Sequence, residues 1–290
     1  MRDEGAMKRA SLCVLIAFAV VAAFAQKAPK SRFFTTSDGV RIHYLEAGKG
    51  PAIVFIPGWQ MPGWIWEKQI AHFSAKYRVI ALDPRSQGES GKPADGNYPE
   101  RRARDYKELV DHRKLAPAVL VGWSMGVPEI MAYVDQFGAN DLSGVVLVDG
   151  FVVVDDDVAK VFPMWLKSLE MDRKGFTDRF VHSMYKKPQP ESYYERLTAA
   201  ALKTPTNSAV TLGVGMIGRA DWLPVFPKLA KTPVLYVVTN VLIKQLDPVR
   251  AALPQLQSEI FEDAGHALFV DEAERFNLVV ERFLEGARAK

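Results

Sequence analysis

AVLVGWSMGVPEIMAYV, residues 118–134, holds a single serine between two glycines. The apolar residues 118–122 predict a buried strand, and the apolar spacing after residue 126 predicts a helix. Gly122 and Gly126 stand two positions before and two after Ser124, and glycines permit the crowded turn of a nucleophile elbow. The glycine spacing alone is weak evidence, because serine and glycine are common in tight turns. The flanking strand and helix favour Ser124 as a nucleophile.

A serine hydroxyl needs a base to take its proton, and histidine is the usual one. His266 stands on a glycine-preceded loop in IFEDAGHALFVDEAERF, after the last strand and before the last helix. Catalytic groups of open parallel sheets gather at the C-terminal ends of the strands, so Ser124 and His266 can meet although they are distant in sequence. We predict that His266 is the base. The other histidines are expected to be structural or solvated: His43, His72, His112 and His182.

Beyond Pro29, short β-branched runs alternate with helical-period stretches, a pattern typical of an α/β fold with helices on both faces of a mostly parallel sheet. Five runs are apolar enough to be central strands: 52–56, 78–82, 118–122, 144–148 and 233–238. Ahead of them, FFTT and VRIHYL predict an antiparallel edge hairpin that turns at residues 37–39. Helices are predicted at about 64–76, 99–114, 126–138, 244–252 and 270–286.

One segment interrupts this alternation, because no strand-like run occurs from Phe151 to about Lys228. Within it, DVAKVFPMWLKSL places six apolar side chains on one helical face: Val158, Val161, Phe162, Trp165, Leu166 and Leu169. We interpret residues 151–228 as an inserted helical cap, and a long surface excursion is the alternative. The core would then consist of residues 26–150 and 229–290.

Composition limits the classes of function. The chain has 290 residues, 48% hydrophobic and 24% charged, which is ample for one large core. Its 37 basic and 34 acidic residues are well mixed, without a basic block suited to a phosphate backbone, so nucleic acid is not an expected partner. Cys13 is the only cysteine, so neither a disulfide nor a cysteine metal site is expected.

The N-terminal segment MKRASLCVLIAFAVVAAFAQ has the features of a secretory signal peptide. Two basic residues precede an apolar run from Leu12 to Ala25, which ends in Ala-Phe-Ala. The run is shorter than the roughly 20 residues of a membrane-spanning helix, so an uncleaved anchor is the lesser alternative. We expect cleavage after Ala25, a secreted or periplasmic protein, and no membrane association after cleavage. Met7 is an alternative start.

Four motifs are spread over the chain: GWSMG, IPGWQMPGWIWEKQI, ALDPRSQGES and DAGHALFVDEAERF. With these motifs the sequence resembles the α/β-hydrolase family over about residues 33–286, and most closely its esterase and cofactor-free haloperoxidase branches. This resemblance implies the α/β-hydrolase fold with an eight-stranded sheet, a serine nucleophile, and neither a metal nor an organic cofactor. It also implies backbone N–H groups of Trp59 and Met125 as the oxyanion hole, although Pro57 stands where the family usually has histidine.

The family commonly places the acid of its triad a few positions beyond the seventh strand, where this chain has Leu242. Without a carboxylate, the histidine would lose the group that fixes its tautomer. Asp149, at the tip of the sixth strand, is the first candidate, because some family members supply the acid from there. A cap for the start of the insertion is its structural alternative. Asp247 is the second candidate and Asp263 the third.

These features predict a secreted serine hydrolase that cleaves small to medium apolar carboxylic esters through an acyl-enzyme. Trp123, Trp165 and Phe162 are the expected pocket residues, although such aromatics can equally belong to the core. Fold resemblance does not choose among esters, lactones and amides. Perhydrolysis by a haloperoxidase-like enzyme stays open, as does a non-catalytic ligand-binding protein. The sequence does not indicate the oligomeric state.

Overall fold

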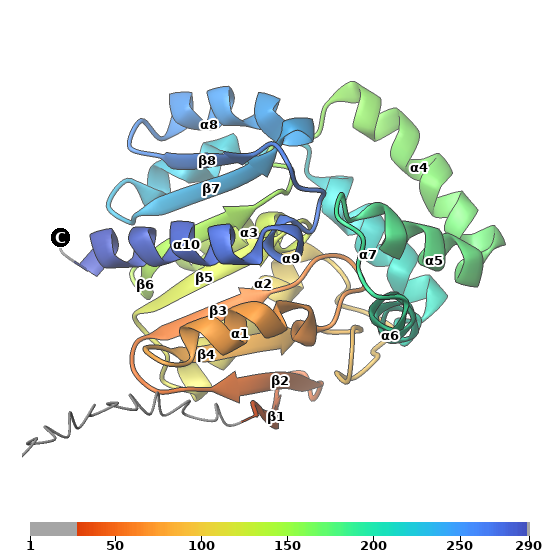
Figure 1. The fold of residues 1–290 in the computed structure, drawn as a ribbon, viewed down its shortest axis with the longest axis horizontal. Helices are drawn as coiled ribbons and strands as arrows, with labels where there is room; N and C mark the ends of the chain where they lie inside the picture. Colours follow the sequence, from red (N-terminus) through yellow and green to blue (C-terminus); the bar gives the residue numbers. More distant parts are fainter. Residues whose placement is uncertain (1–27, 289–290) are drawn as a thin grey trace, which may run out of the picture.

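A single sheet of eight strands organises the computed structural model, which describes residues 28–288 (Figure 1). The strand order is β1-β2-β4-β3-β5-β6-β7-β8. β1 pairs antiparallel with β2 and β2 antiparallel with β4, and all other neighbours are parallel. The strands are β1 Lys30–Thr35, β2 Arg41–Ala47, β3 Ala52–Ile56, β4 Arg78–Asp83, β5 Ala118–Trp123, β6 Leu142–Val148, β7 Val234–Thr239 and β8 Gln257–Phe261. The predicted signal peptide lies outside the described residues.

Helices cover both faces of this sheet, and the central strands β3 to β7 are therefore buried on both sides. Alternate residues of a strand point to opposite faces, so Val54 packs in one apolar cluster and Phe55 in the other. The first cluster includes residues of α2 Pro99–His112, α3 Gly126–Phe137 and α8 Leu246–Ala252. The second includes residues of α1 Glu67–Phe73, α9 Leu268–Asp271 and α10 Ala273–Arg288. The predicted fold class is confirmed.

The predicted elements differ from the observed ones mainly at helix boundaries. The predicted helix 64–76 starts as the 3-10 helix η1 Gly63–Trp66, and α1 ends at Phe73. The predicted helix 244–252 starts inside the 3-10 helix η3 Asn240–Gln245. The predicted helix 270–286 is interrupted at Glu272, whose φ of −124° and ψ of 51° are not helical. The apolar spacing continues across this one-residue break, so the sequence pattern does not reveal it.

Four helices lie in the interval of the predicted cap, at the right of Figure 1: α4 Asp156–Met171, α5 Arg173–Ser183, α6 Glu191–Ala201 and α7 Thr206–Gly218. A bridge between Val153 and Asp221 joins the two chain segments that enter and leave it, and η2 Leu223–Leu229 leads back to the sheet. Of the six apolar side chains predicted on one face, Val161 is 62% exposed, because it lies at the edge of that face of α4. No helix within residues 28–288 is long and apolar enough to cross a membrane.

Candidate active site

Ser124 lies at the sharp turn between β5 and α3, with a φ of 56°. This left-handed conformation is uncommon for a residue with a side chain and is typical of strained functional turns. The flanking glycines are required by close packing. A Cβ on Gly122 would lie 2.5 Å from the carbonyl oxygen of Gly126, and one on Gly126 would lie 2.9 Å from that of Ile56. The turn therefore has the geometry of a nucleophile elbow.

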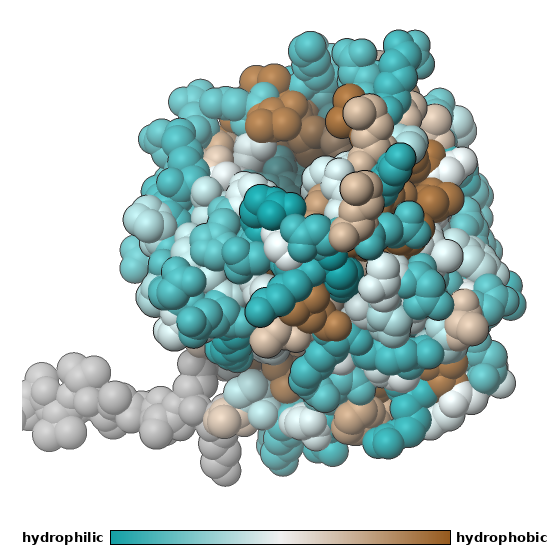
Figure 2. Space-filling view, turned by 90° about the vertical axis from the view of Figure 1, so that its right-hand side faces the viewer, coloured by the Kyte–Doolittle hydropathy of each residue, from teal (hydrophilic) through white to brown (hydrophobic). Residues whose placement is uncertain are grey.

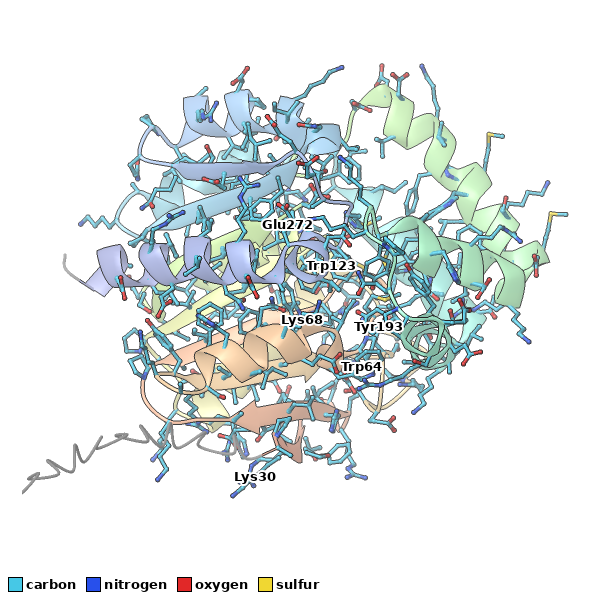
Figure 3. All side chains as sticks on the ribbon, viewed as in Figure 1. Lys30, Trp64, Lys68, Trp123, Tyr193 and Glu272 are labelled. Carbon is cyan, nitrogen blue, oxygen red and sulfur yellow. The ribbon has the colours of Figure 1, made fainter. Side chains whose placement is uncertain are left out.

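The loop that carries His266 packs directly against this elbow. The indole nitrogen of Trp123, the residue before Ser124, donates a hydrogen bond to the His266 carbonyl oxygen at 2.8 Å. The two rings lie 5.1 Å apart between centroids, and Figure 3 shows Trp123 close to α9. His266 Nδ1 lies 2.8 Å from Asp149 Oδ2. Because a carboxylate only accepts hydrogen bonds, Nδ1 carries the proton and Nε2 has no protein partner within residues 28–288.

Asp149 is held rigidly at the end of β6, and its side chain is only 2% exposed. Its backbone has a φ of 42°, and its Oδ1 accepts hydrogen bonds from the N–H of Thr239 at 2.7 Å and from the hydroxyl of Thr239 at 2.9 Å. The Tyr236 hydroxyl donates to the carbonyl oxygen of Gly150 at 2.6 Å. Thr239 was not among the predicted site residues. A polar residue ending a buried strand, in PVLYVVT, was the available signal.

The other acidic candidates lie away from His266. Asp247 has a 90% exposed side chain and Asp263 an 81% exposed one, and each pairs with a nearby cation. Leu242, at the position where the family commonly has its acid, is buried in the core. Of the three predicted acids, the structure brings only Asp149 to His266.

Two free backbone N–H groups flank the elbow. Neither the amide of Trp59 nor that of Met125 has an acceptor in the described part of the chain. The segment before Trp59 touches the elbow, since a Cβ on Gly58 would lie 3.0 Å from the Cβ of Ser124. The Trp59 indole donates to the carbonyl oxygen of Ala209 in α7 at 2.8 Å, which anchors this segment to the cap. Paired N–H groups of this kind can stabilise an oxyanion.

An apolar hollow of about 470 Å³ opens between α4 and the segment that precedes it, and is lined by Phe151, Asp157, Val158, Val161, Phe162 and Trp165. Trp165 packs against Trp59 with the two rings tilted by 36° and their centroids 5.0 Å apart. Trp123, the third predicted pocket residue, is buried beneath His266 and does not line this hollow. Figure 2, which turns the cap end toward the viewer, shows brown apolar patches near its top among polar side chains.

A second, larger hollow of about 810 Å³ has a different character. It lies where β3 and β4 begin, at the opposite end of these strands from Ser124. Its lining includes Glu46 and the two arginines that form ion pairs with it, Arg78 and Arg113. Because ligands of open α/β sheets bind at the C-terminal ends of the strands, the smaller apolar hollow is the better substrate site.

The remaining histidines have other surroundings: His43 pairs with Asp83, His72 with Glu281, His112 stacks on Phe34, and His182 stacks on Tyr194. Within the described residues, no three His, Cys, Asp or Glu side chains group closely enough to hold a metal ion.

A sequence profile of the Alpha/beta hydrolase family matches residues 53–277. The chain belongs to the alpha/beta hydrolase family. A protein of Synechocystis sp. that is named as a non-heme chloroperoxidase is 29% identical over 271 residues, which cover 86% of this chain and 96% of that protein. Non-heme chloroperoxidase CPO-A1 of Kitasatospora aureofaciens is 39% identical over 115 residues, which cover 39% of this chain and 42% of that protein.

The esterase EaEST from Exiguobacterium antarcticum superposes on this alpha/beta hydrolase with a TM-score of 0.82 and 21% identity, covering 88% of this chain and 100% of that one. At this identity the superposition supports the fold alone. The predicted resemblance to the haloperoxidase-like branch of the alpha/beta hydrolases is confirmed by the matched profile and the named relatives.

Proposed function

We propose that this alpha/beta hydrolase is a serine hydrolase that cleaves carboxylic esters through an acyl-enzyme. The observation that carries the proposal is the strained Ser124 turn beside the His266–Asp149 pair, whose nitrogen and oxygen lie 2.8 Å apart. Ser124 acts as the nucleophile, His266 as the base, and Asp149 fixes the tautomer of His266 and stabilises its charge. The N–H groups of Trp59 and Met125 stabilise the oxyanion.

The reaction proceeds in two halves. Ser124 Oγ attacks the ester carbonyl carbon while His266 Nε2 takes the hydroxyl proton, and the tetrahedral oxyanion accepts hydrogen bonds from the two free N–H groups. The C–O bond to the alcohol then breaks, and His266 gives the proton to the departing alcohol. Water next attacks the acyl-enzyme, again with His266 as the base, which releases the acid and restores Ser124.

The lining of the apolar hollow supports an apolar acyl or alcohol group on the substrate. Phe162 and Trp165 come from α4, and Phe151 stands shortly after Asp149 of the proposed triad in the sequence. A volume of about 470 Å³ falls within the common range for small-molecule sites. Small to medium carboxylic esters are therefore the proposed substrate class.

A fluorophosphonate probe and an activated aryl ester test this proposal together. The wild-type protein is expected to bind the probe covalently on Ser124 and to hydrolyse the ester. Ser124→Ala should lose both, with a fall in kcat of about 10³-fold or more. Peptide mapping identifies the labelled residue, and circular dichroism checks the fold. Unchanged hydrolysis by Ser124→Ala would exclude the serine mechanism, and an inert wild-type protein would favour a ligand-binding role.

Perhydrolysis is a second candidate, favoured by the similarity to two proteins named as non-heme chloroperoxidases. In this reaction hydrogen peroxide replaces water, attacks the acyl-enzyme and leaves as a peracid. Peracid formation from an acetate ester and hydrogen peroxide measures it, with Ser124→Ala as the control. A peracid yield no greater than that of Ser124→Ala would leave hydrolysis as the function.

We further propose that residues 1–25 direct export and are removed. Mass spectrometry of the exported protein should find Gln26 at its N-terminus. Recovery of the intact segment on a membrane-retained protein would identify it as an anchor instead.

A further inference from the structure

A buried polar network lies directly behind the two free N–H groups, starting from Gln87 in the loop after β4. The Gln87 side-chain amide donates to the carbonyl oxygens of Gly58 at 3.0 Å and Met61 at 2.7 Å. These two carbonyls bracket Trp59, so one side chain holds both ends of the segment that supplies the first N–H group. Gln87 is fully buried, so its hydrogen bonds are shielded from solvent.

Arg102 of α2 continues the network toward the elbow. Its Nη1 donates to Gln87 Oε1 at 3.0 Å and lies 3.9 Å from the sulfur of Met125, the residue that supplies the second N–H group. Its Nε lies 3.1 Å from Glu129 Oε1 in α3, and the other Glu129 oxygen accepts a hydrogen bond from the Tyr106 hydroxyl. One guanidinium therefore contacts both the Trp59 segment, through Gln87, and the helix that begins at the elbow.

Stability alone does not account for this arrangement. Arg102 and Glu129 are both almost completely buried, and a buried ion pair often contributes no more stability than apolar side chains of the same volume. Two Arg102 donors, Nε and Nη2, also have no well-aligned acceptor within the described residues. What the network does supply is a fixed distance between two separate chain segments, β3–η1 and β5–α3.

We propose that Gln87 and Arg102 are positioning residues that fix the Trp59 and Met125 N–H groups relative to each other and to Ser124. This inference rests on the proposed function, because it assigns the network to transition-state stabilisation. An oxyanion hole requires its donors about 3 Å from the oxyanion, and removing one donor typically costs 10²- to 10³-fold in kcat. Loosening both donors should cost less than removal, about 10-fold or more, and chiefly in kcat, because the oxyanion forms only in the transition state.

Gln87→Met and Gln87→Glu test the amide itself. Both keep the length of the side chain and lose its N–H donors, and Gln87→Glu retains an acceptor for Arg102. Each variant is expected to lower kcat on an activated ester by about 10-fold with KM changed less than about twofold. Gln69→Met is the matched control. Gln69 is also a fully buried glutamine, and its amide donates to the backbone carbonyl of Phe269 and to Asn277 Oδ1 rather than to the Trp59 segment.

Arg102→Lys and Arg102→Met test the second proposed positioning residue, Arg102. Lysine keeps the charge and can donate to Gln87, so Arg102→Lys should retain more of the wild-type kcat than Arg102→Met. Thermal unfolding of every variant separates stability from kinetics. A kcat loss in Gln69→Met equal to that in Gln87→Met, or wild-type kcat in Gln87→Met, would overturn the positioning role while the Ser124-dependent activity stands. An inactive wild-type protein, indistinguishable from Ser124→Ala, would overturn the proposed function and this inference with it.

Discussion

Two regions of this alpha/beta hydrolase contain serine, histidine and aspartate side chains, and only one of them has the surroundings of a catalytic site. At the antiparallel edge of the sheet, His43 Nδ1 lies 2.8 Å from Asp83 Oδ2, and His43 Nε2 lies 2.9 Å from the hydroxyl of Ser31. The His266–Asp149 distance is the same, 2.8 Å. Hydrogen-bond lengths alone therefore do not separate the two groups.

The backbone around each serine does separate them. Ser124 sits in a left-handed turn between the free N–H groups of Trp59 and Met125. Ser31 lies within the extended strand β1, opposite Leu45, and has no positive φ. A nucleophile must project from the chain toward paired oxyanion donors, and a serine in a regular strand does not. The fold of the main chain, rather than the set of side chains, therefore distinguishes the candidate catalytic site.

The edge group has a structural role that its other contacts explain. Besides His43, Asp83 accepts hydrogen bonds from the backbone N–H of Gly63 at 2.6 Å and of Glu89 at 2.7 Å. It thus ties β2, η1 and the loop after β4 together. We expect substitutions in this group to lower stability and those in the Ser124 group to lower activity.

The largest difference in kcat is expected between variants of the two aspartates, Asp149 and Asp83. Asp149→Asn should fold normally and lose about 10²- to 10⁴-fold in kcat with little change in KM, because His266 loses the group that orients it. Asp83→Asn should retain kcat within about threefold and lower the unfolding free energy instead. Steady-state kinetics and chemical denaturation of both variants measure this. If Asp83→Asn were the inactive variant, or if Asp247→Asn were crippled and Asp149→Asn were not, the assignment of the two regions would be wrong.

The unfolding free energy is expected to depend on pH through Glu129, which belongs to the buried network beside the Ser124 region. Burial raises the pKa of Glu129 to about 7, with Asp105 adding to the rise and Arg102 and Tyr106 opposing it. A carboxyl group with a raised folded-state pKa contributes stability that is complete below its unfolded pKa of about 4.5 and is lost as the pH rises through about 7. The loss is on the order of 3 kcal/mol.

Glu129→Gln removes this titration, so it isolates the effect. Between pH 5 and 8, the unfolding free energy of the wild-type protein should fall relative to that of Glu129→Gln, while other titrating groups cancel in the difference. Urea denaturation at several pH values measures the slope. A pH-independent difference would show that Glu129 stays ionised throughout this range.

Variants of two tryptophans test which hollow takes the substrate. Trp165 lines the apolar hollow beside α4, and Trp64 lines a groove of about 330 Å³ beside Leu45 of the edge hairpin, where it also contacts Tyr193 (Figure 3). Trp165→Ala should raise KM roughly fivefold for esters with longer acyl chains, a loss of about 1 kcal/mol of apolar contact, and change acetate esters little. Trp64→Ala should leave the chain-length preference unaltered. The same preference in wild type and Trp165→Ala would remove Trp165 from the acyl pocket.

The smallest effects are expected from single hydroxyl groups. Thr239→Val removes one of the two Thr239 hydrogen bonds to Asp149 Oδ1, and should lower kcat about threefold. Ser31→Ala removes the hydroxyl bonded to His43, and should cost at most about 1 kcal/mol of stability without changing kcat. Steady-state kinetics and thermal unfolding of Thr239→Val and Ser31→Ala measure these effects. Fluorophosphonate labelling of Ser31 in a Ser124→Ala background would contradict the structural role of the edge group.

Much of the fold was predictable because it depends on local patterns. The central strands β3 to β7 lie within two residues of the predicted apolar runs, since a strand buried on both faces must be apolar throughout. The elbow at Ser124 was predictable for a similar reason, because only glycine fits at positions 122 and 126 beside a backbone carbonyl. His266 was found by its place after the last strand.

Residues a few positions apart in the sequence were enough to predict the alternation of strands and helices, the serine turn and the strand-free interval between β6 and β7. The three-dimensional fold was needed to show that Asp149, rather than Asp247 or Asp263, lies against His266, 117 residues away in sequence. It alone also joined Gln87 to the segment around Trp59. A hydrogen bond depends on distance and direction in space. The strand order that brings these residues together cannot be derived from their spacing along the chain.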